Sequence, residues 1–401
     1  MTERGHLAML DALGVLIDGS HLAAPDQLPQ VVDEAFEPLG WRITIYLVDF
    51  AQQTLRPLND GRKDVHDESV DGSVAGRCFR QSTPVASQRP EPHVWLPLID
   101  GVDRLGVLRL ELPAEVTLDD PTTSTHLRWA TYLIAHLVGS KSAYTDYFHL
   151  ARLSHERCVS SELIWSLLPP LTVAAEGIAI AGGLEPNHSI AGDVFDYAID
   201  RQTAHLAIAD ATGHDLNAAL VGALVLATYR SGRRRLAGLA ATVAELDDVL
   251  EGFAPDTYAS GVFAELDLRV GVLRYANAGH PSPLLLRGGK VVKSLDGGRR
   301  ILLGFRGRQV PIATEQLEPG DWIIFYTDGV VEARDTDRRM FGLDRLIHLV
   351  QRCAADRQSA AETLRRVVHE VLEHQQGVLQ DDATLVVAQW RTTLEHELVS
   401  T

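Results

Sequence analysis

Residues 322–333 have the sequence Trp-Ile-Ile-Phe-Tyr-Thr-Asp-Gly-Val-Val-Glu-Ala, in which five large apolar residues lead into an Asp-Gly pair. Runs of aromatic and β-branched residues are typical of buried strands, and Asp-Gly is a common turn. We therefore predict a buried strand that ends close to Asp328. Three other places in the C-terminal half set aspartate close to glycine or to a second aspartate where a strand should end. They are Asp193 and Asp196 in Ala191-Gly-Asp-Val-Phe-Asp, Asp210 in Ile208-Ala-Asp-Ala-Thr-Gly-His-Asp, and Asp381 and Asp382 in Leu379-Gln-Asp-Asp-Ala-Thr-Leu-Val.

Each of these aspartates, taken alone, fits a turn or a helix cap. Together they suggest a cation site. Carboxylates flanked by apolar strands are expected to be partly buried, and several negative charges in such surroundings require a cation to balance them. Oxygen-only ligation without a Cys or His cluster indicates Mg²⁺ or Mn²⁺ rather than zinc. Two such ions can activate water and neutralise a phosphoryl group. The sequence contains no GxSxG, P-loop or strand-linked GxGxxG pattern that would favour another chemistry.

The surrounding region, from residue 172 onward, is rich in short apolar runs that predict strands. Four helices are expected among them, at residues 216–229, 243–253, 343–353 and 360–375, with a last strand at 383–390. Many strands with few helices predict a layered sandwich of antiparallel sheets flanked by helices. The N-terminal region, about residues 5–115, shows two helices, a strand at 41–49, a short helix near 72–81 and a strand pair at 94–112, which predict an α+β domain with an antiparallel sheet.

Between these regions, residues 126–168 contain no proline and place apolar residues at alternating three- and four-residue spacing. The pattern predicts one long helix, ended by Pro169 and Pro170, although Lys141, His155 and Glu162 interrupt its apolar face. The helix either packs on its own domain or joins two domains and pairs with a second copy. The expected organisation is an α+β domain over 1–118, a linker or dimerisation helix over 126–168, a sandwich domain over 169–392 and a tail over 393–401.

The amino-acid composition excludes some classes of function. The 401 residues are 45% hydrophobic and 23% charged, and 54 Asp and Glu against 37 Lys and Arg give a formal net charge of -17. This balance argues against nucleic-acid binding and against docking on an anionic membrane, both of which need basic surfaces. Three widely spaced cysteines, no apolar leader and no run long enough to span a bilayer favour a cytoplasmic protein.

With these residues in view, the region from about 155 to 392 resembles the SpoIIE/RsbU-type branch of the metal-dependent protein serine/threonine phosphatases, the PPM family. The matching segments, in the family's order, are Leu167-Leu-Pro, Gly192-Asp-Val-Phe-Asp, Asp210-Ala-Thr-Gly-His, Tyr275-Ala-Asn-Ala-Gly-His-Pro, Leu303-Gly, Pro319-Gly-Asp, Tyr326-Thr-Asp-Gly-Val-Val-Glu-Ala, Phe341-Gly and Asp381-Asp. Residues 5–115 resemble, more faintly, a GAF sensor domain, on the Asp71–Phe79 segment and the strand pair around residues 96–108.

The resemblance implies an α/β/β/α sandwich that holds two Mn²⁺ or Mg²⁺ ions. Carried over to this sequence, the metal ligands would be Asp193, Asp210, Asp328 and Asp381, with the backbone carbonyl of Ala211 in the place of a glycine carbonyl. Asp196 and Asp382 would orient ligands or waters. His280 is expected to shape a turn rather than bind metal, and Glu332 to cap a helix. His214 would assist proton transfer or order its loop.

The function implied is hydrolysis of phosphoserine or phosphothreonine on a regulatory partner, a STAS-type anti-anti-sigma factor, by a homodimer whose N-terminal domain senses an unnamed signal. Two departures from the family pattern, Ala191 and Asp215, motivate an alternative: a catalytically weak module that binds a phosphoprotein without hydrolysing it. A nucleotide-hydrolysing enzyme with the same metals would need a triphosphate-binding loop, and none is recognisable.

Overall fold

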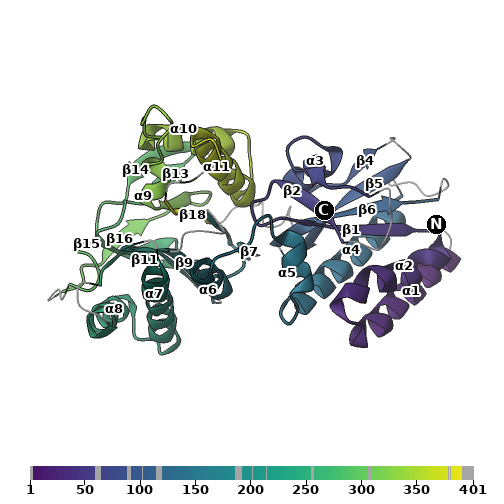
Figure 1. Cartoon of the computed structure of the whole chain (residues 1–401), viewed down its shortest axis with the longest axis horizontal. Coiled ribbons are helices and arrows are strands. Elements are labelled where there is room, and N and C mark those ends of the chain that lie inside the picture. The colour runs from purple at the N-terminus through teal and green to yellow at the C-terminus, as the bar shows by residue number, and fades with distance from the viewer. Residues whose placement is uncertain are drawn as a thin grey trace. The chain divides into compact units, whose positions relative to one another are not determined.

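A computed structural model describes residues 3–58, 65–87, 92–101, 103–113, 120–185, 192–200, 202–213, 215–253, 257–305, 309–377, 379 and 381–390. The chain divides into two units, Met1–His155 and Glu156–His396. Each unit is described by itself below, with its elements labelled as in Figure 1.

The first unit is built on one antiparallel sheet with the strand order β3-β2-β1-β6-β5-β4. Its strands are β1 (Arg42–Val48), β2 (Thr54–Pro57), β3 (Glu68–Ser69), β4 (Val85–Ser87), β5 (His93–Asp100) and β6 (Asp103–Glu111). Its helices are α1 (Glu3–Leu22), α2 (Leu28–Phe36), α3 (Val74–Gln81), α4 (Pro121–Ser142) and α5 (Tyr147–Arg152), with 3-10 turns η1 (Pro25–Gln27) and η2 (Glu37–Leu39). The predicted antiparallel α+β domain is thereby confirmed, and its kinship with GAF domains stays a prediction.

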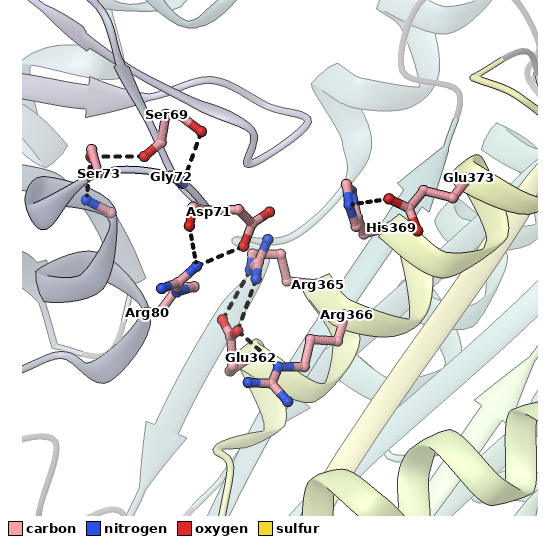
Figure 2. A network of polar contacts seen from close by, with 11 residues as sticks. Ser69, Asp71, Gly72, Ser73, Arg80, Glu362, Arg365, Arg366, His369 and Glu373 are labelled. Atoms are coloured by element: carbon pink, nitrogen blue, oxygen red, sulfur yellow. Dashed lines mark hydrogen bonds and ion pairs between the residues drawn. The ribbon is translucent and has the colours of Figure 1, made fainter.

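Both faces of this sheet are covered. On one face α1, α2, α4 and α5 bury a core that includes Met9, Leu28, Ile45 and Ile134, and on the other α3 covers a smaller core around Phe79. The start of α3 is fixed locally: the Ser73 hydroxyl accepts a hydrogen bond from Gly76 N (2.9 Å), as is usual for a helix N-cap. An ion pair from Arg80 to Asp71 (2.8 Å) holds the same segment (Figure 2).

The single helix predicted over residues 126–168 is wrong, because the structure forms three helices there: α4, α5 and, in the second unit, α6 (Val159–Leu167). Contacts from the β1–β2 turn stabilise the break after α5. Ser154 Oγ donates to the buried Asp49 carboxylate (2.8 Å), and Phe50 N donates to Arg152 O (3.1 Å). Lys141, which interrupted the apolar pattern, is buried and donates to Ala23 O (2.8 Å). Sequence spacing cannot reveal these partners, which lie about a hundred residues away.

The second unit contains two sheets. One has the order β14-β13-β17-β18-β8-β7, and the other has the order β15-β12-β11-β10-β9 with β16 also paired to β12. The strands are β7 (Thr172–Ala175), β8 (Ile178–Glu185), β9 (Asp193–Ile199), β10 (Thr203–Ala211), β11 (Ala259–Asp267), β12 (Val272–Ala278), β13 (Leu284–Arg287), β14 (Lys290–Ser294), β15 (Arg299–Arg300), β16 (Ala313–Gln316), β17 (Trp322–Tyr326) and β18 (Ala383–Trp390). The helices are α6, α7 (Leu216–Arg234), α8 (Leu239–Phe253), α9 (Asp328–Val331), α10 (Leu343–Ala355) and α11 (Ala360–His374).

These elements form four layers, and they confirm the predicted α/β/β/α sandwich (Figure 1). Helices α7 and α8 pack on the β9–β12 sheet, and α10 and α11 pack on the other sheet. The inner faces of the sheets meet closely, because a Cβ on Gly182 of β8 would lie 2.4 Å from the Phe195 ring of β9. On α11, Glu362 is buried and accepts hydrogen bonds from Arg365 and Arg366 (Figure 2). Among the described residues, no helix is long and apolar enough to cross a membrane.

Candidate active site

Four of the aspartates predicted from the sequence lie where strands of both sheets begin or end. Asp193 is the first residue of β9 and is paired directly with Asp210 near the end of β10. Directly paired residues point to the same face of a sheet, so the two carboxylates are neighbours. In the other sheet, Asp328 begins α9 just after β17, and Asp381 lies just before β18, the antiparallel neighbour of β17.

Asp193 is the most buried of the four, with 1% of its surface exposed. Its Oδ2 accepts a hydrogen bond from the Thr327 hydroxyl (2.7 Å), which comes from the opposite sheet. Burial raises the pKa of Asp193 well above its usual value, and the charges of Asp210 and Asp382 raise it further. Thus the carboxylate is held in one orientation, in surroundings that penalise its negative charge unless a cation is near.

The pKa of Asp210 is raised for the same reasons as that of Asp193. Burial raises its pKa to about 7, with added contributions from the charges of Asp328, Asp381 and Asp382. These contributions come from residues 118 or more positions away in the chain, so folding has gathered the carboxylates into one electrostatic cluster. A bound cation would relieve this repulsion directly.

The start of β9 is held by the second member of the Asp381-Asp382 pair. Asp382 Oδ2 accepts hydrogen bonds from Gly192 N (2.6 Å) and Asp193 N (3.2 Å). Gly192 leaves room for carbonyl oxygens, because a Cβ at this position would lie 2.9 Å from Ala211 O. The Ala211 carbonyl therefore lies against the segment that carries Asp193, and Asp382 acts on the backbone of that segment, in keeping with the orienting role predicted for it.

Asp196 lies away from the cluster and has another partner. It stands three residues after Asp193 on β9, so its side chain points to the opposite face of the strand. There it is 2% exposed and pairs with Arg230 (2.7 Å) and Arg233 (2.9 Å) of α7. Asp196 therefore joins the sheet to its covering helix, and the prediction that it orients metal ligands or waters finds no contact in support.

Asp215, one of the two departures from the family pattern, caps a helix. Its Oδ1 accepts hydrogen bonds from Asn217 N (2.9 Å) and Ala218 N (3.1 Å) at the start of α7. A carboxylate in this position satisfies free amide groups and interacts favourably with the helix dipole. The other departure, Ala191, and the candidate His214 lie outside the described residues.

His280 and Glu332 take structural positions. His280 N donates to Asn277 Oδ1 (2.8 Å), Asn277 Nδ2 donates back to His280 O (3.0 Å), and the His280 ring lies 2.5 Å from Ser260 Oγ. Burial lowers the pKa of His280 to about 3, so the ring is neutral at physiological pH. The predicted turn role agrees with these bonds. Glu332 ends α9, its backbone N donating to Asp328 O (2.7 Å).

Sequence reasoning missed Thr327, the residue between β17 and Asp328. Its hydroxyl contacts Asp193, and it is fully buried. The available signal was its position, since a polar residue between an apolar strand and a candidate ligand needs a hydrogen-bond partner if it is buried.

The donor chemistry of the cluster fits Mn²⁺ or Mg²⁺, since every candidate donor is an oxygen and the carboxylates repel one another. Within the described ranges, however, no three Asp, Glu, His or Cys side chains stand close enough together to form a finished metal site. Asp328 and Asp381 are exposed, and the charge of each raises the pKa of Asp210.

Residues 200–391 match the family model described as stage II sporulation protein E (SpoIIE). This segment belongs to the SpoIIE family. The SpoIIE domain is thus a PPM-type serine/threonine phosphatase domain, as the sequence predicted, and phosphatases of this class depend on metal ions.

The individual relatives of this segment include one protein named as a phosphoserine phosphatase. Protein IcfG of Synechocystis is 28% identical over 134 residues, and phosphoserine phosphatase RsbU of Bacillus subtilis is 23% identical over 262 residues. These matches cover 33% and 64% of this chain, 21% of IcfG and 77% of RsbU. Among solved structures, the SiaA PP2C domain of Pseudomonas aeruginosa is 22% identical with a TM-score of 0.49, covering 58% of this chain and 93% of that one.

Proposed function

We propose that this chain is a metal-dependent protein phosphatase that removes phosphate from serine or threonine of a regulatory partner in bacterial signalling. The observation that carries the proposal is the cluster of carboxylates at one edge of the sandwich, where burial raises the pKa of Asp210 to about 7 and the charges of Asp328, Asp381 and Asp382 add to the effect. A solvated acidic surface would not raise the pKa in this way, whereas a cation site would have this character before it is loaded.

The side chains of this protein would bind the two metal ions and orient them toward the phosphate of the substrate. Asp193 and Asp210 would hold the two ions from the β9–β10 side, with the Ala211 carbonyl beside them, and Asp328 and Asp381 would approach from the other sheet. When bound, Mn²⁺ or Mg²⁺ supplies charge that stabilises a phosphoryl group and makes water more acidic. Asp382 would keep the backbone at Gly192 in place while the substrate binds.

The partner we propose is a phosphorylated STAS-type anti-anti-sigma factor, and RsbU, a phosphoserine phosphatase, supports this class of substrate. We propose that the first unit senses a signal and gates the activity. The alternative is a module that binds a phosphoprotein without hydrolysing it. Asp215 was one of its two supports, and this support is weakened because the Asp215 carboxylate has a structural role as the N-cap of α7.

A single assay separates the two functions. The full chain is incubated with a phosphorylated STAS protein encoded near it in its genome, with Mn²⁺ and with EDTA, and released phosphate is measured. Release with Mn²⁺ and none with EDTA is expected. Tight binding of the phosphoprotein without release under either condition would favour the binding module.

We further propose that the chain forms a homodimer through one face of α1 and α4. The helices lie side by side, since His6 Nδ1 contacts His126 Nε2 (2.9 Å) near their starts and Lys141 Nζ donates to Ala23 O near their ends. Their outer surface, the α1–α4 face, exposes large apolar side chains at helical spacing. These are Leu7 (57%), Leu10 (45%) and Ile17 (54%) on α1, and Trp129 (38%) and Tyr132 (37%) on α4.

The dimer proposal predicts a change in mass. The double variant Leu10→Glu with Ile17→Glu should be a monomer by light scattering, because charges would replace apolar contacts at the centre of the α1–α4 face. Val292→Glu on β14, which is 52% exposed and belongs to the other unit, is the matched control and should remain dimeric. A wild-type chain that is monomeric at micromolar concentration would contradict the proposal.

A further inference from the structure

We propose that Thr327 is a positioning residue that fixes how the Asp193 carboxylate is turned toward a cation. The inference deepens the proposed function and rests on it for the identity of the cation. It assigns a role to a residue that is not among the candidate metal ligands.

The first support is the direction of the hydrogen bonds around the Thr327 hydroxyl. Thr384 N donates to Thr327 Oγ1 (3.0 Å), and an amide N–H can only donate. The hydroxyl oxygen is thereby used as an acceptor, and its proton is directed to Asp193 Oδ2 (2.7 Å). Oδ2 of Asp193 is therefore held by Thr327, and the Thr384 side chain also hydrogen-bonds this carboxylate, so the β17–β18 pair fixes how Asp193 is turned toward a cation.

The second support is the rigidity of the segment that carries the hydroxyl. Thr327 N donates to Thr384 O (3.0 Å), so Thr327 is tied to β18 by both its backbone and its side chain. Thr327 and Thr384 are both fully buried, and water therefore cannot replace either bond. The Thr327 side chain is locked before any ion binds, as a group that positions a ligand must be.

The third support is that the contact joins the two sheets at the site. Thr327 follows β17 in one sheet, and Asp193 begins β9 in the other. The residue after Thr327 is Asp328, itself a candidate ligand. Together with the bonds from Gly192 N and Asp193 N to Asp382 Oδ2, this hydrogen bond joins candidate ligands of opposite sheets, and it is the one of the three that acts on the Asp193 carboxylate itself.

The test uses Thr327→Val, which keeps the shape but removes the hydroxyl, and Thr327→Ser, which restores it. Thr363→Val is the matched control, because Thr363 is equally buried but lies on α11. Mn²⁺ affinity is measured by calorimetry on the full chain, together with the Tm of the metal-free protein and the rate of phosphate release.

The valine variant should bind Mn²⁺ about 10- to 100-fold more weakly than wild type, as is typical when a residue that orients a metal ligand is removed. The serine variant should recover wild-type affinity to within about threefold, and Thr363→Val should keep wild-type affinity even if its Tm falls. Wild-type affinity in Thr327→Val, or an affinity in Thr327→Ser as weak as in Thr327→Val, would overturn the inference.

Failure of the proposed function gives a different result. If wild type binds Mn²⁺ and the valine variant does not, but no phosphoprotein is hydrolysed, the role of Thr327 stands and the phosphatase proposal fails. If wild type binds no Mn²⁺ at all, the role of Thr327 is overturned as well.

Discussion

Replacing Asp210 with asparagine is expected to lower Mn²⁺-dependent turnover of p-nitrophenyl phosphate by more than about 100-fold, since even residues that only orient metal ligands account for 10- to 100-fold. Asparagine keeps the size and one oxygen but removes the charge that would hold a cation between the strand ends. Asp328→Asn should have a similar effect, because its charge acts on the same cluster. Turnover is measured with purified, folded variants over a range of Mn²⁺ concentrations.

Asp248→Asn is the matched control, because it makes the same change on α8, away from the cluster. It should retain wild-type turnover. Wild-type turnover in both Asp210→Asn and Asp328→Asn would show that the carboxylate cluster is not the catalytic centre and would remove the main support for the proposed function.

The same substitution should have the opposite effect on stability when metal is absent. In EDTA at pH 8, Asp210 is ionised in both the folded and the unfolded chain. In the folded chain, burial of the charge and repulsion by the neighbouring carboxylates raise the free energy of the folded state. Asp210→Asn removes that cost, so the metal-free variant should unfold at a Tm a few degrees above wild type. A loss of activity together with a gain in Tm would separate a functional ligand from a residue needed for folding.

The pKa of Asp210 also fixes how this gain depends on pH. Its folded value of about 7 lies above the value of about 3.9 for an unfolded chain, so the folded state holds the proton more strongly between these limits. The stability of the metal-free wild type should therefore fall as pH rises from about 4 to 7. The advantage of Asp210→Asn should be largest above pH 7 and should shrink toward pH 4, which thermal unfolding at several pH values would measure.

Much of the fold could be predicted because it depends on local patterns. The apolar run before Asp328 is a strand, the last predicted strand, at residues 383–390, agrees with β18, and the four-layer arrangement follows from the order of strands and helices. The cluster of four aspartates was also predictable, because each borders an apolar run. Asp210 and Asp328 lie where a strand ends, whereas Asp193 and Asp381 lie where a strand begins, and both kinds of terminus meet at the edges of sheets.

Other features depended on contacts that spacing does not encode. The break between α5 and α6 involves Asp49 and Ser154, which are 105 residues apart, and the hydrogen bond from Thr327 to Asp193 joins residues 134 apart. Two local signals were available but were outweighed by the family pattern. Asp196 lies at an odd offset from Asp193 and so must face the other side of its strand, and Asp215 stands in the N-cap position of a predicted helix.

The second large effect is expected at Gly329, the residue that follows Asp328. A Cβ at this position would lie 1.8 Å from the carbonyl oxygen of Asp382 and 2.8 Å from its carbonyl carbon. Both atoms belong to the backbone and cannot rotate away, so Gly329→Ala must push α9 and the start of β18 apart. Forced insertion of one methyl group into a packed site costs about 1–3 kcal/mol, which thermal unfolding would detect.

The consequences for the site should exceed this cost in stability. Asp382 N donates to Asp381 Oδ1 (2.9 Å), while Asp382 Oδ2 holds Gly192 N and Asp193 N. A displaced Asp382 would therefore disturb candidate ligands from both sheets at once. We expect Gly329→Ala to lose most of its Mn²⁺ affinity, measured by calorimetry under conditions in which the variant is still folded.

Gly252→Ala provides the control, because no atom lies within 4 Å of the Cβ it would add to α8. Alanine is preferred to glycine within helices, so this variant should be as stable as wild type or more stable by about 0.4–1 kcal/mol, with unchanged Mn²⁺ affinity. If Gly329→Ala matched this control in both Tm and Mn²⁺ affinity, the close approach of α9 to Asp382 would not be a requirement of the site. The cation would then have to be held by Asp193 and Asp210 without help from the Asp381-Asp382 pair, because that pair is the part of the cluster that the added methyl group displaces.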